Sequence, residues 1–382
     1  MKVRLDSVCK INMGQSPDSS TYNDNKEGIP FFQGNADFGD IYPNIRKWCS
    51  NPIKIANKND ILLSVRAPIG AMNIANCECC IGRGLAALTV NSDVCLNKYL
   101  WYLMSNKVEL LNSMGTGSTF KAINKTVLSQ LSVYIPSITE QSRIVMTLDK
   151  VNDLIAKRHK QLEKLDELVK AKFVEMFGTL LNPSSSFKYD FLKNLCKKIT
   201  DGKHGGCTKQ DGSGHYFIGA RDIFDDKVHY EHALEINIDE FKKDYKRCNV
   251  EIGDFLIVNT GATIGKSAIA CDLRTTRTLL QKSVALLKLN TELLNPVFLK
   301  YCYKINENMY KVKSASAQPN LLLSEIKMTS IYVPSMELQN EFFEFVKCTE
   351  KFKDNINESL CGLEVLKKSL MQKFFTGSGY CE

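Results

Sequence analysis

Apolar residues recur at seven-residue spacing along two long stretches of this chain. In the first stretch, between Glu140 and Phe177, the repeated apolar positions are Leu148, Ile155, Leu162, Val169 and Met176. In the second stretch, shifted by 198 residues, this seam and its alternate seam together give Phe342, Val346, Ile356, Leu360, Leu363, Leu370 and Phe374, interrupted by Thr349, Lys353 and Lys367. Heptad spacing is typical of coiled-coil helices, whose apolar stripes pack against each other. We therefore predict two long antiparallel helices that pair with one another, each about 57 Å long at 1.5 Å per residue.

The ends of the first helix also have sequence signals. Ser137 and Glu140 have the spacing of a capping box, in which the two residues satisfy free backbone N–H groups at a helix start. Gly178 follows the last residue of the stretch, and glycine is common just past a helix end. The predicted helix therefore runs from Glu140 to Phe177.

The segments that precede the two helices are copies of one another. GSTFKAINKTVLSQLSVYIPS, from Gly117 to Ser137, aligns without a gap on ASAQPNLLLSEIKMTSIYVPS, from Ala315 to Ser335. Further upstream, FFQGNAD answers YFIGARD, and NDILLSVRAPIG answers GDFLIVNTGATIG. A repeat of this length indicates two similar domains, and two domains suggest a two-part target.

Each copy contains short runs with strand propensity between Gly, Asn and Pro residues. These predicted strands are Ile61–Val65, Ala86–Val90, Leu131–Ile135, Phe255–Val258, Ser283–Leu289 and Ser330–Val333. Shorter helices are predicted to start at Leu96 and Leu294. The expected fold is α+β, with two tandem modules of mixed helix and sheet separated by a long antiparallel coiled coil, in a pseudo-twofold internal repeat. The expected boundaries are residues 1–138, 139–180, 181–336 and 337–377.

Composition limits the class of protein. No apolar run approaches the roughly 20 residues that span a bilayer, and the start of the chain has no signal-peptide core, so we expect a cytoplasmic protein without a membrane partner. The formal net charge is +8, and lysines and arginines recur in the predicted loops, which suits a polyanionic partner. Among 14 cysteines only Cys77, Cys79 and Cys80 cluster, without the second ligand pair that a zinc site needs, so buried thiols are expected.

Two fragments of catalytic or nucleotide-binding motifs are better explained in other ways, and a third motif is absent. GATIGKS, from Gly261 to Ser267, has three residues between its glycines where a phosphate-binding loop needs four, and a turn shared by the copies explains it better. Asp18, Asp24 and Lys26 could form a small magnesium nuclease, but the second copy has no counterpart. No two prolines are adjacent, so the [DN]PP[YF] motif of amino-methyltransferases is absent. We predict a chain without a catalytic site or a metal site.

The run that leads into the first long helix resembles a known family. The pattern P-x-x-x-E-Q-x-x-I is met by Pro136, Glu140, Gln141 and Ile144. In the second copy Pro334 and Gln339 match, while Leu338 replaces the glutamate and Phe342 the isoleucine. With GIPFFQGNAD, DILLSVRAPIG and CIGRGLAAL, and with Gln281 expected at the place of Arg83, almost the whole chain resembles the DNA specificity subunit of type I restriction-modification systems.

The resemblance implies a function for each part. Each module would be a target recognition domain that reads one half-site of a gapped sequence in double-stranded DNA, and the helices would set the spacer between the half-sites. The helices would also dock methyltransferase subunits, two of them in our expectation, that carry S-adenosylmethionine and methylate adenine N6. Restriction subunits would bring ATP, magnesium and DNA cleavage. The chain itself would hold no cofactor and would not be an enzyme.

Base edges are read mainly by Arg, Gln and Asn, and phosphates are held mainly by Lys, Arg, Ser and Thr. Residues of these kinds in predicted loops, or in runs that the copies share, are the candidate DNA contacts. In the first module they are Gln15, Ser16, Arg46, Arg66, Arg83, Ser118 and Lys121. In the second module they are Lys203, His204, Lys209, Arg221, Lys266, Gln281 and Gln318.

Three alternatives remain open. A two-headed protein scaffold would use the same helices but would have no affinity for DNA. A nuclease built on Asp18, Asp24 and Lys26 would cut DNA by itself with magnesium. A specificity subunit of a related system would serve a methyltransferase alone, or a fused methyltransferase-nuclease.

Overall fold

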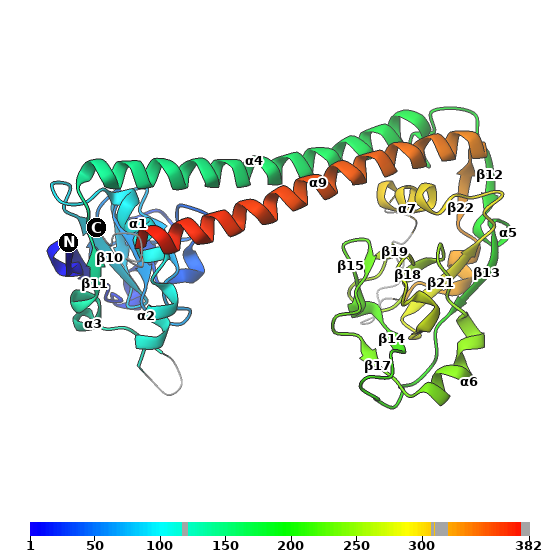
Figure 1. The fold of residues 1–382 in the computed structure, drawn as a ribbon, viewed down its shortest axis with the longest axis horizontal. Helices are drawn as coiled ribbons and strands as arrows, with labels where there is room; N and C mark the ends of the chain where they lie inside the picture. Colours follow the sequence, from blue (N-terminus) through cyan, green and yellow to red (C-terminus); the bar gives the residue numbers. More distant parts are fainter. Residues whose placement is uncertain (117–120, 307–308, 310–319, 376–382) are drawn as a thin grey trace. The chain divides into compact units, whose positions relative to one another are not determined.

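The computed structural model of the chain describes residues 1–116, 121–306, 309 and 320–375 (Figure 1). These residues form two compact units. One unit contains Met1–His159 and the segment that begins at Asn357, and the other contains Lys160–Ile356. Each unit therefore consists of one module together with part of each long helix. Among the described residues, no helix has the length and apolar character that a bilayer span requires.

The two predicted long helices are present. They are α4, Ile138–Phe177, and α9, Met336–Phe375. The first begins two residues before the predicted start, and the backbone N–H of Glu140 donates to the Ser137 hydroxyl at 3.3 Å, as a capping residue requires. Gly178, with φ 73°, follows the last residue of α4 in the left-handed conformation that ends many helices.

Within each unit, α4 and α9 bury apolar side chains against the module and against each other. In the first unit Ile144 and Leu148 share a core with Phe374 and Phe375, and the Phe375 ring lies 5.4 Å from the ring of Tyr99. This packing ties the end of α9 to the start of α4.

In the second unit the Phe173 ring lies 5.3 Å from that of Phe342. The Lys353 ammonium lies 2.6 Å from the Asp166 carboxylate. The residue numbers rise along α4 as they fall along α9, so the two helices run antiparallel within this unit. Among the predicted repeat positions, Leu148, Val169, Phe342, Val346, Leu360 and Phe374 are buried, and the others are half-buried.

The first module is built on two main sheets, both seen in the described residues. The antiparallel sheet has the order β2, Cys9–Met13; β10, Leu85–Val90; β7, Ile61–Ser64; β8, Met72–Ile74. The mixed sheet has the order β3, Tyr22–Asn23; β5, Lys47–Cys49; β4, Ile29–Phe32; β9, Cys79–Ile81; β6, Ile55–Ala56, with β4 and β9 parallel. The remaining elements are β1, Lys2–Arg4, paired with β11, Ser132–Tyr134; α1, Asn97–Ser105; α2, Val108–Met114; α3, Lys125–Gln130; and the 3-10 turns η1, Leu5–Ser7, η2, Ser19–Thr21, and η3, Asn35–Asp37.

The second module repeats this plan. Its antiparallel sheet has the order β13, Cys196–Asp201; β21, Val284–Leu289; β18, Phe255–Val258; β19, Ser267–Ile269. Its smaller sheet has the order β17, Leu234–Glu235; β14, Tyr216–Ile218; β20, Thr278–Leu280, with β14 and β20 parallel. The remaining elements are β12, Lys188–Phe191, paired with β22, Ser330–Val333; β15, Ile223–Phe224, paired with β16, Lys227–Val228; α5, Leu192–Leu195; α6, Ile238–Cys248; α7, Pro296–Ile305; α8, Leu323–Lys327; and the turns η4, Ala220–Asp222, and η5, Thr275–Arg277.

All six predicted strands are confirmed to within a residue at either end. The helix predicted from Leu96 starts at Asn97 but is two helices, since α1 ends at Ser105 and α2 begins only at Val108. In the second copy α7 starts at Pro296, where Asn295 caps it by accepting from the N–H of Val297 at 2.9 Å.

The copies share individual hydrogen bonds as well as strand order. The N–H of Asn59 donates to Ala75 O at 2.8 Å, and the N–H of Gly253 donates to Ala270 O at 2.8 Å. Gly70 and Gly265, with φ 95° and 88°, hold the same turn between β7 and β8 and between β18 and β19. The interpretation of Gly261–Ser267 as a turn shared by the copies is therefore confirmed.

Candidate nucleic-acid interface

In the first module, the loops that follow four strands meet at one edge of the sheets. Backbone hydrogen bonds tie them together: Gln15 N–H to Ile81 O at 3.0 Å, Gly84 N–H to Gln33 O at 3.2 Å, Val65 N–H to Gly84 O at 2.9 Å, and Ile123 N–H to Val65 O at 2.9 Å. We call residues 14–16, 33–34, 65–67, 82–84 and 121–123 the first loop edge. It brings together five of the predicted DNA contacts, namely Gln15, Ser16, Arg66, Arg83 and Lys121.

The Ser16 hydroxyl joins two of these loops through hydrogen bonds. It accepts from the side-chain Nε2 of Gln33 at 2.9 Å and from the backbone N–H of Arg83 at 3.3 Å. The Arg83 and Gln33 side chains are exposed on either side of it. Gln33 was not among the predicted contacts, although it lies in the run FFQGNAD that the sequence marks as shared by the copies.

Arg46 lies at the same end of the mixed sheet. It directly precedes β5, and the pairing of Lys47 with Phe31 sets it beside the end of β4, which Gln33 follows. Its side chain is exposed, so it adds a cation next to the first loop edge.

The second module forms the equivalent edge, the second loop edge, from residues 202–204, 219–221, 259–260, 281–283 and 320–321. Three hydrogen bonds correspond to those of the first edge: Lys203 N–H to Leu280 O at 2.7 Å, Asn259 N–H to Ser283 O at 3.0 Å, and Leu321 N–H to Asn259 O at 2.8 Å. A fourth, Gln281 N–H to Ile218 O at 2.8 Å, corresponds to the bond from Gly82 N–H to Phe32 O at 2.8 Å in the first module. The edge is hollowed by an open pocket of about 460 Å³ with a polar lining: Lys203, Gly205, Thr260, Gln281, Lys282, Ser283 and Asn320.

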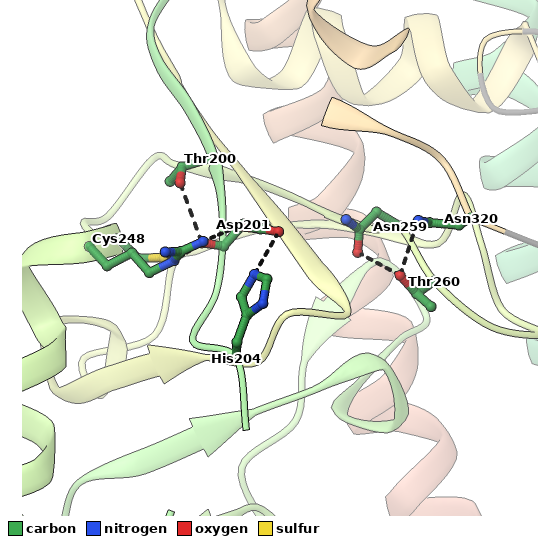
Figure 2. Close-up of polar contacts among 8 residues, drawn as sticks. Thr200, Asp201, His204, Cys248, Asn259, Thr260 and Asn320 are labelled. Carbon is green, nitrogen blue, oxygen red and sulfur yellow. Dashed lines mark hydrogen bonds and ion pairs between the residues drawn. The ribbon is translucent and has the colours of Figure 1, made fainter. Parts of the chain in front are cut away.

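Figure 2 shows how side chains are held around this edge. The Thr260 hydroxyl donates to Asn320 Oδ1 at 3.1 Å, which joins the end of β18 to the segment before α8. On the other side, His204 Nε2 lies 3.6 Å from the carboxylate of Asp201, the last residue of β13. The pocket is therefore bordered by fixed polar groups from three segments.

The charge of Lys203 is already paired with carboxylates of the protein. Its ammonium lies 2.6 Å from Asp244 and 3.6 Å from Glu240, both on α6. The hydrogen bond from Lys203 to Asp244 raises the pKa of this lysine above its ordinary value. Lys203 thus anchors α6 to the edge, whereas Lys282 is exposed beside it without an ion pair to another described residue.

Comparison with known proteins decides the family. The family model described as "Type I restriction modification DNA specificity domain" matches twice, at residues 1–166 and 185–361. The chain belongs to this family of specificity subunits. The resemblance seen in the sequence is therefore confirmed, and the two matches fall on the two copies.

Individual relatives agree with this assignment. The putative type I restriction enzyme MjaX specificity subunit of Methanocaldococcus jannaschii is 42% identical over 161 residues, which is 42% of this chain but only 38% of that protein's length. The MjaIX specificity subunit of the same organism is 24% identical over 352 residues, 87% of this chain and 79% of that protein. The type I restriction-modification S subunit of M. genitalium shares the fold, with a TM-score of 0.54 at 17% identity over 98% of this chain and 96% of that one.

In this specificity subunit, the expected equivalence of Gln281 and Arg83 is wrong by one position. The N–H of Gly82 donates to Phe32 O at 2.8 Å, just as the N–H of Gln281 donates to Ile218 O at 2.8 Å, so Gln281 matches Gly82 and Lys282 matches Arg83. Short runs such as CIGRGLAAL and LLQKSVAL do not fix the register to one residue, so the sequence comparison also missed Lys282. Separately, the first copy has one further residue, Gln33, between β4 and the turn that follows it.

The other predicted contacts are dispersed. Arg221 follows Gly219 within the second loop edge, and the carbonyl of Lys266 accepts from the N–H of Val258 at the end of β18. Lys209 lies apart, paired with Asp211 at 2.9 Å and bridged to Ile236 beyond β17. Ser118 and Gln318 fall outside the residues that the structure describes.

The residues weighed for metal chemistry have structural surroundings. Cys79 and Cys80 are fully buried, whereas Cys77 is partly exposed. Asp18 caps η2, where its carboxylate accepts from the N–H of Ser20 at 2.9 Å. Over the described part of the chain, no group of three or more His, Cys, Asp or Glu residues is placed to hold a metal ion.

Proposed function

We propose that this chain is the sequence-reading subunit of a type I restriction-modification complex and that each module reads one half-site of a bipartite target in double-stranded DNA. The observation that carries the proposal is the loop edge that occurs once in each module, joined by the same backbone hydrogen bonds. Two equivalent recognition edges in one chain suit a target with two parts separated by unread base pairs.

The chemistry of the edges supports DNA as the ligand. Arg66, Arg83 and Arg46 in the first module and Arg221, Lys266 and Lys282 in the second are exposed cations at loop positions. Arginine reads guanine in the major groove and also holds phosphates, whereas lysine mostly holds phosphates. Both residue types therefore suit binding to double-stranded DNA. A protein scaffold has no need for such a set in both copies.

In this proposal α4 and α9 pair as an antiparallel coiled coil and set the length of the spacer between the half-sites. The recognition domains are residues 1–138 and 181–336, and the helical segments are residues 139–180 and 337–377. Apolar side chains that remain exposed on α4 and α9, among them Leu154, Leu168, Phe352 and Val365, suit the docking of methyltransferase subunits.

The chain performs no chemistry in this proposal. Two methyltransferase subunits bind S-adenosylmethionine and methylate adenine N6, and restriction subunits supply ATP-dependent cleavage with magnesium. The complex works in the cytoplasm. The same recognition role would also serve a methyltransferase alone or a fused methyltransferase-nuclease, and the identity of the partner distinguishes these systems.

Modified-base sequencing of genomic DNA tests the proposal. Cells that make the chain with its methyltransferase should carry a gapped adenine motif, and cells that lack only this chain should lose it. Replacing residues 1–138 with the equivalent domain of another specificity subunit should change one half of the motif and keep the other half and the spacer. An unchanged pattern of methylation in the deletion would reject the proposal. Binding of duplex DNA by the purified complex, measured in buffer without magnesium, would then test the scaffold alternative.

A further inference from the structure

The residues directly after the parallel strands are exchanged between the two modules. In the first module Gln33 follows β4 and Gly82 follows β9. In the second module Gly219 follows β14, the counterpart of β4, and Gln281 follows β20, the counterpart of β9. Each module therefore has one glutamine and one glycine at this pair of strand ends, in opposite order.

In both modules the glutamine amide lies over the glycine of the neighbouring strand end. A Cβ atom added at Gly82 would come within 2.9 Å of Gln33 Oε1. A Cβ atom added at Gly219 would come within 2.3 Å of Gln281 Oε1 and 2.6 Å of its Cδ. The two carboxamides therefore reach equivalent places at the two loop edges. That of Gln33 comes from the end of β4, and that of Gln281 comes from the end of β20, the counterpart of β9.

The hydrogen-bonding groups of these amides are available to a ligand. Gln33 donates one Nε2 hydrogen to Ser16 Oγ, which fixes the direction of the amide and leaves Oε1 and the second N–H free of partners among the described residues. Gln281 lines the open polar pocket of the second edge, and its side chain has no hydrogen bond to another residue that the structure describes. A carboxamide oxygen beside an N–H matches the N6 amino group and N7 of adenine in the major groove.

We propose that Gln33 and Gln281 are the adenine-reading residues of the two modules, each contacting one adenine of its own half-site. The inference rests on the proposed function, since it names the base class read at the two edges. A backbone kept free of side chains at Gly82 and Gly219 is part of each reader, because it makes room for the amide. An amide that is needed at this place in both half-sites explains why one module supplies it from one strand and the other module from the neighbouring strand.

The test is selection of duplexes from a randomised pool by the full chain in complex with its methyltransferase. Gln33→Ala should reduce the preference for adenine at one position of one half-site by about 5- to 150-fold, the range expected for a bidentate base contact. Gln281→Ala should do the same in the other half-site. In each variant the untouched half-site reports that the protein is folded and bound, and Gln130→Ala, an exposed glutamine on α3, should change neither.

Glycine variants move the amide without removing it. Gly219→Ala should weaken the same position as Gln281→Ala, because the new Cβ displaces the amide. Gly206→Ala, whose Cβ meets no atom within 4 Å, is the matched control and should leave the preference intact. A wild-type complex that selects no sequence would defeat the proposed function itself. A wild-type complex that selects a gapped sequence, with adenine preference unchanged in Gln33→Ala and Gln281→Ala, would overturn only this inference.

Discussion

Gln141 and Gln339 make the same three hydrogen bonds in the two copies, and both are fully buried. Gln141 Oε1 accepts from Leu96 N–H at 2.8 Å, and its Nε2 donates to Val94 O and Pro136 O at 3.0 Å each. Gln339 Oε1 accepts from Asn295 N–H at 2.8 Å, and its Nε2 donates to Leu293 O at 3.1 Å and Pro334 O at 2.9 Å. The glutamine of the family pattern thus clamps a module to the start of its long helix.

Removing this clamp should destabilise one unit at a time. Gln141→Ala leaves three partly buried backbone groups without their side-chain partner, so we expect a loss of about 1–3 kcal/mol in the unfolding free energy of the first unit. Gln339→Ala should have the same effect on the second unit. Urea unfolding combined with hydrogen exchange locates the loss. Gln130→Ala is the exposed control, and a loss no larger than that of the control would contradict the role of the clamp.

The cations Arg83 and Lys282 occupy equivalent positions and should hold phosphates or bases in the same way. Each alanine variant should weaken binding of the target duplex and reduce the slope of log K against log salt by about 1. Titration of a labelled duplex at several salt concentrations measures both quantities. Lys2→Ala removes the same charge from β1 and should leave the slope unchanged. Equal slopes in all variants would show that neither cation touches the DNA.

Thiol reactivity should follow burial. Burial raises the pKa of the Cys302 and Cys95 thiols to about 12, so their reactive thiolates are scarce at pH 8. Cys271, Cys348 and Cys361 are exposed. Alkylation with iodoacetamide at pH 8, followed by mass spectrometry over time, should modify Cys271, Cys348 and Cys361 before Cys302 and Cys95. Rapid labelling of Cys302 in the native chain would mean that the core around α7 opens readily.

A surface ion pair should make the folding stability of the second unit depend slightly on pH. The hydrogen bond from the Arg274 guanidinium lowers the pKa of Asp272 to about 2. A carboxylate with a lowered pKa stabilises the fold above its unfolded value near 4, and that contribution disappears as pH falls toward 2. Both groups are about one-third exposed, so the effect at pH 7 should be under about 1 kcal/mol. The Tm difference between wild type and Asp272→Asn should therefore narrow below pH 4, and a difference that widened there would contradict the assignment.

The sequence predicted the elements better than the details of the edges. Periodicity located α4 and α9 because their buried stripes repeat over many turns, but it missed Phe173, which lies outside the selected heptad positions and packs on the module as well as on Phe342. Strand propensity located the sheets. The equivalence of Gln281 failed because loops of different length separate the matched segments of the two copies, and short similar runs do not fix the register to one residue. Lys203 was chosen for its charge, but the Asp244 carboxylate pairs with it. Asp244 lies on α6, far from Lys203 in the sequence, and only the tertiary fold brings the two residues together.

The exchanged glutamine and glycine also constrain how the two modules can have diverged from a common ancestor. Conversion of one order into the other requires the gain or loss of one residue after β4 or its counterpart and one substitution after β9 or its counterpart. The intermediate with two glycines lacks the amide, and the intermediate with two glutamines crowds the new side chain against the old one, as the 2.3 Å approach at Gly219 indicates. A change at either position should therefore be tolerated only together with a change at the other.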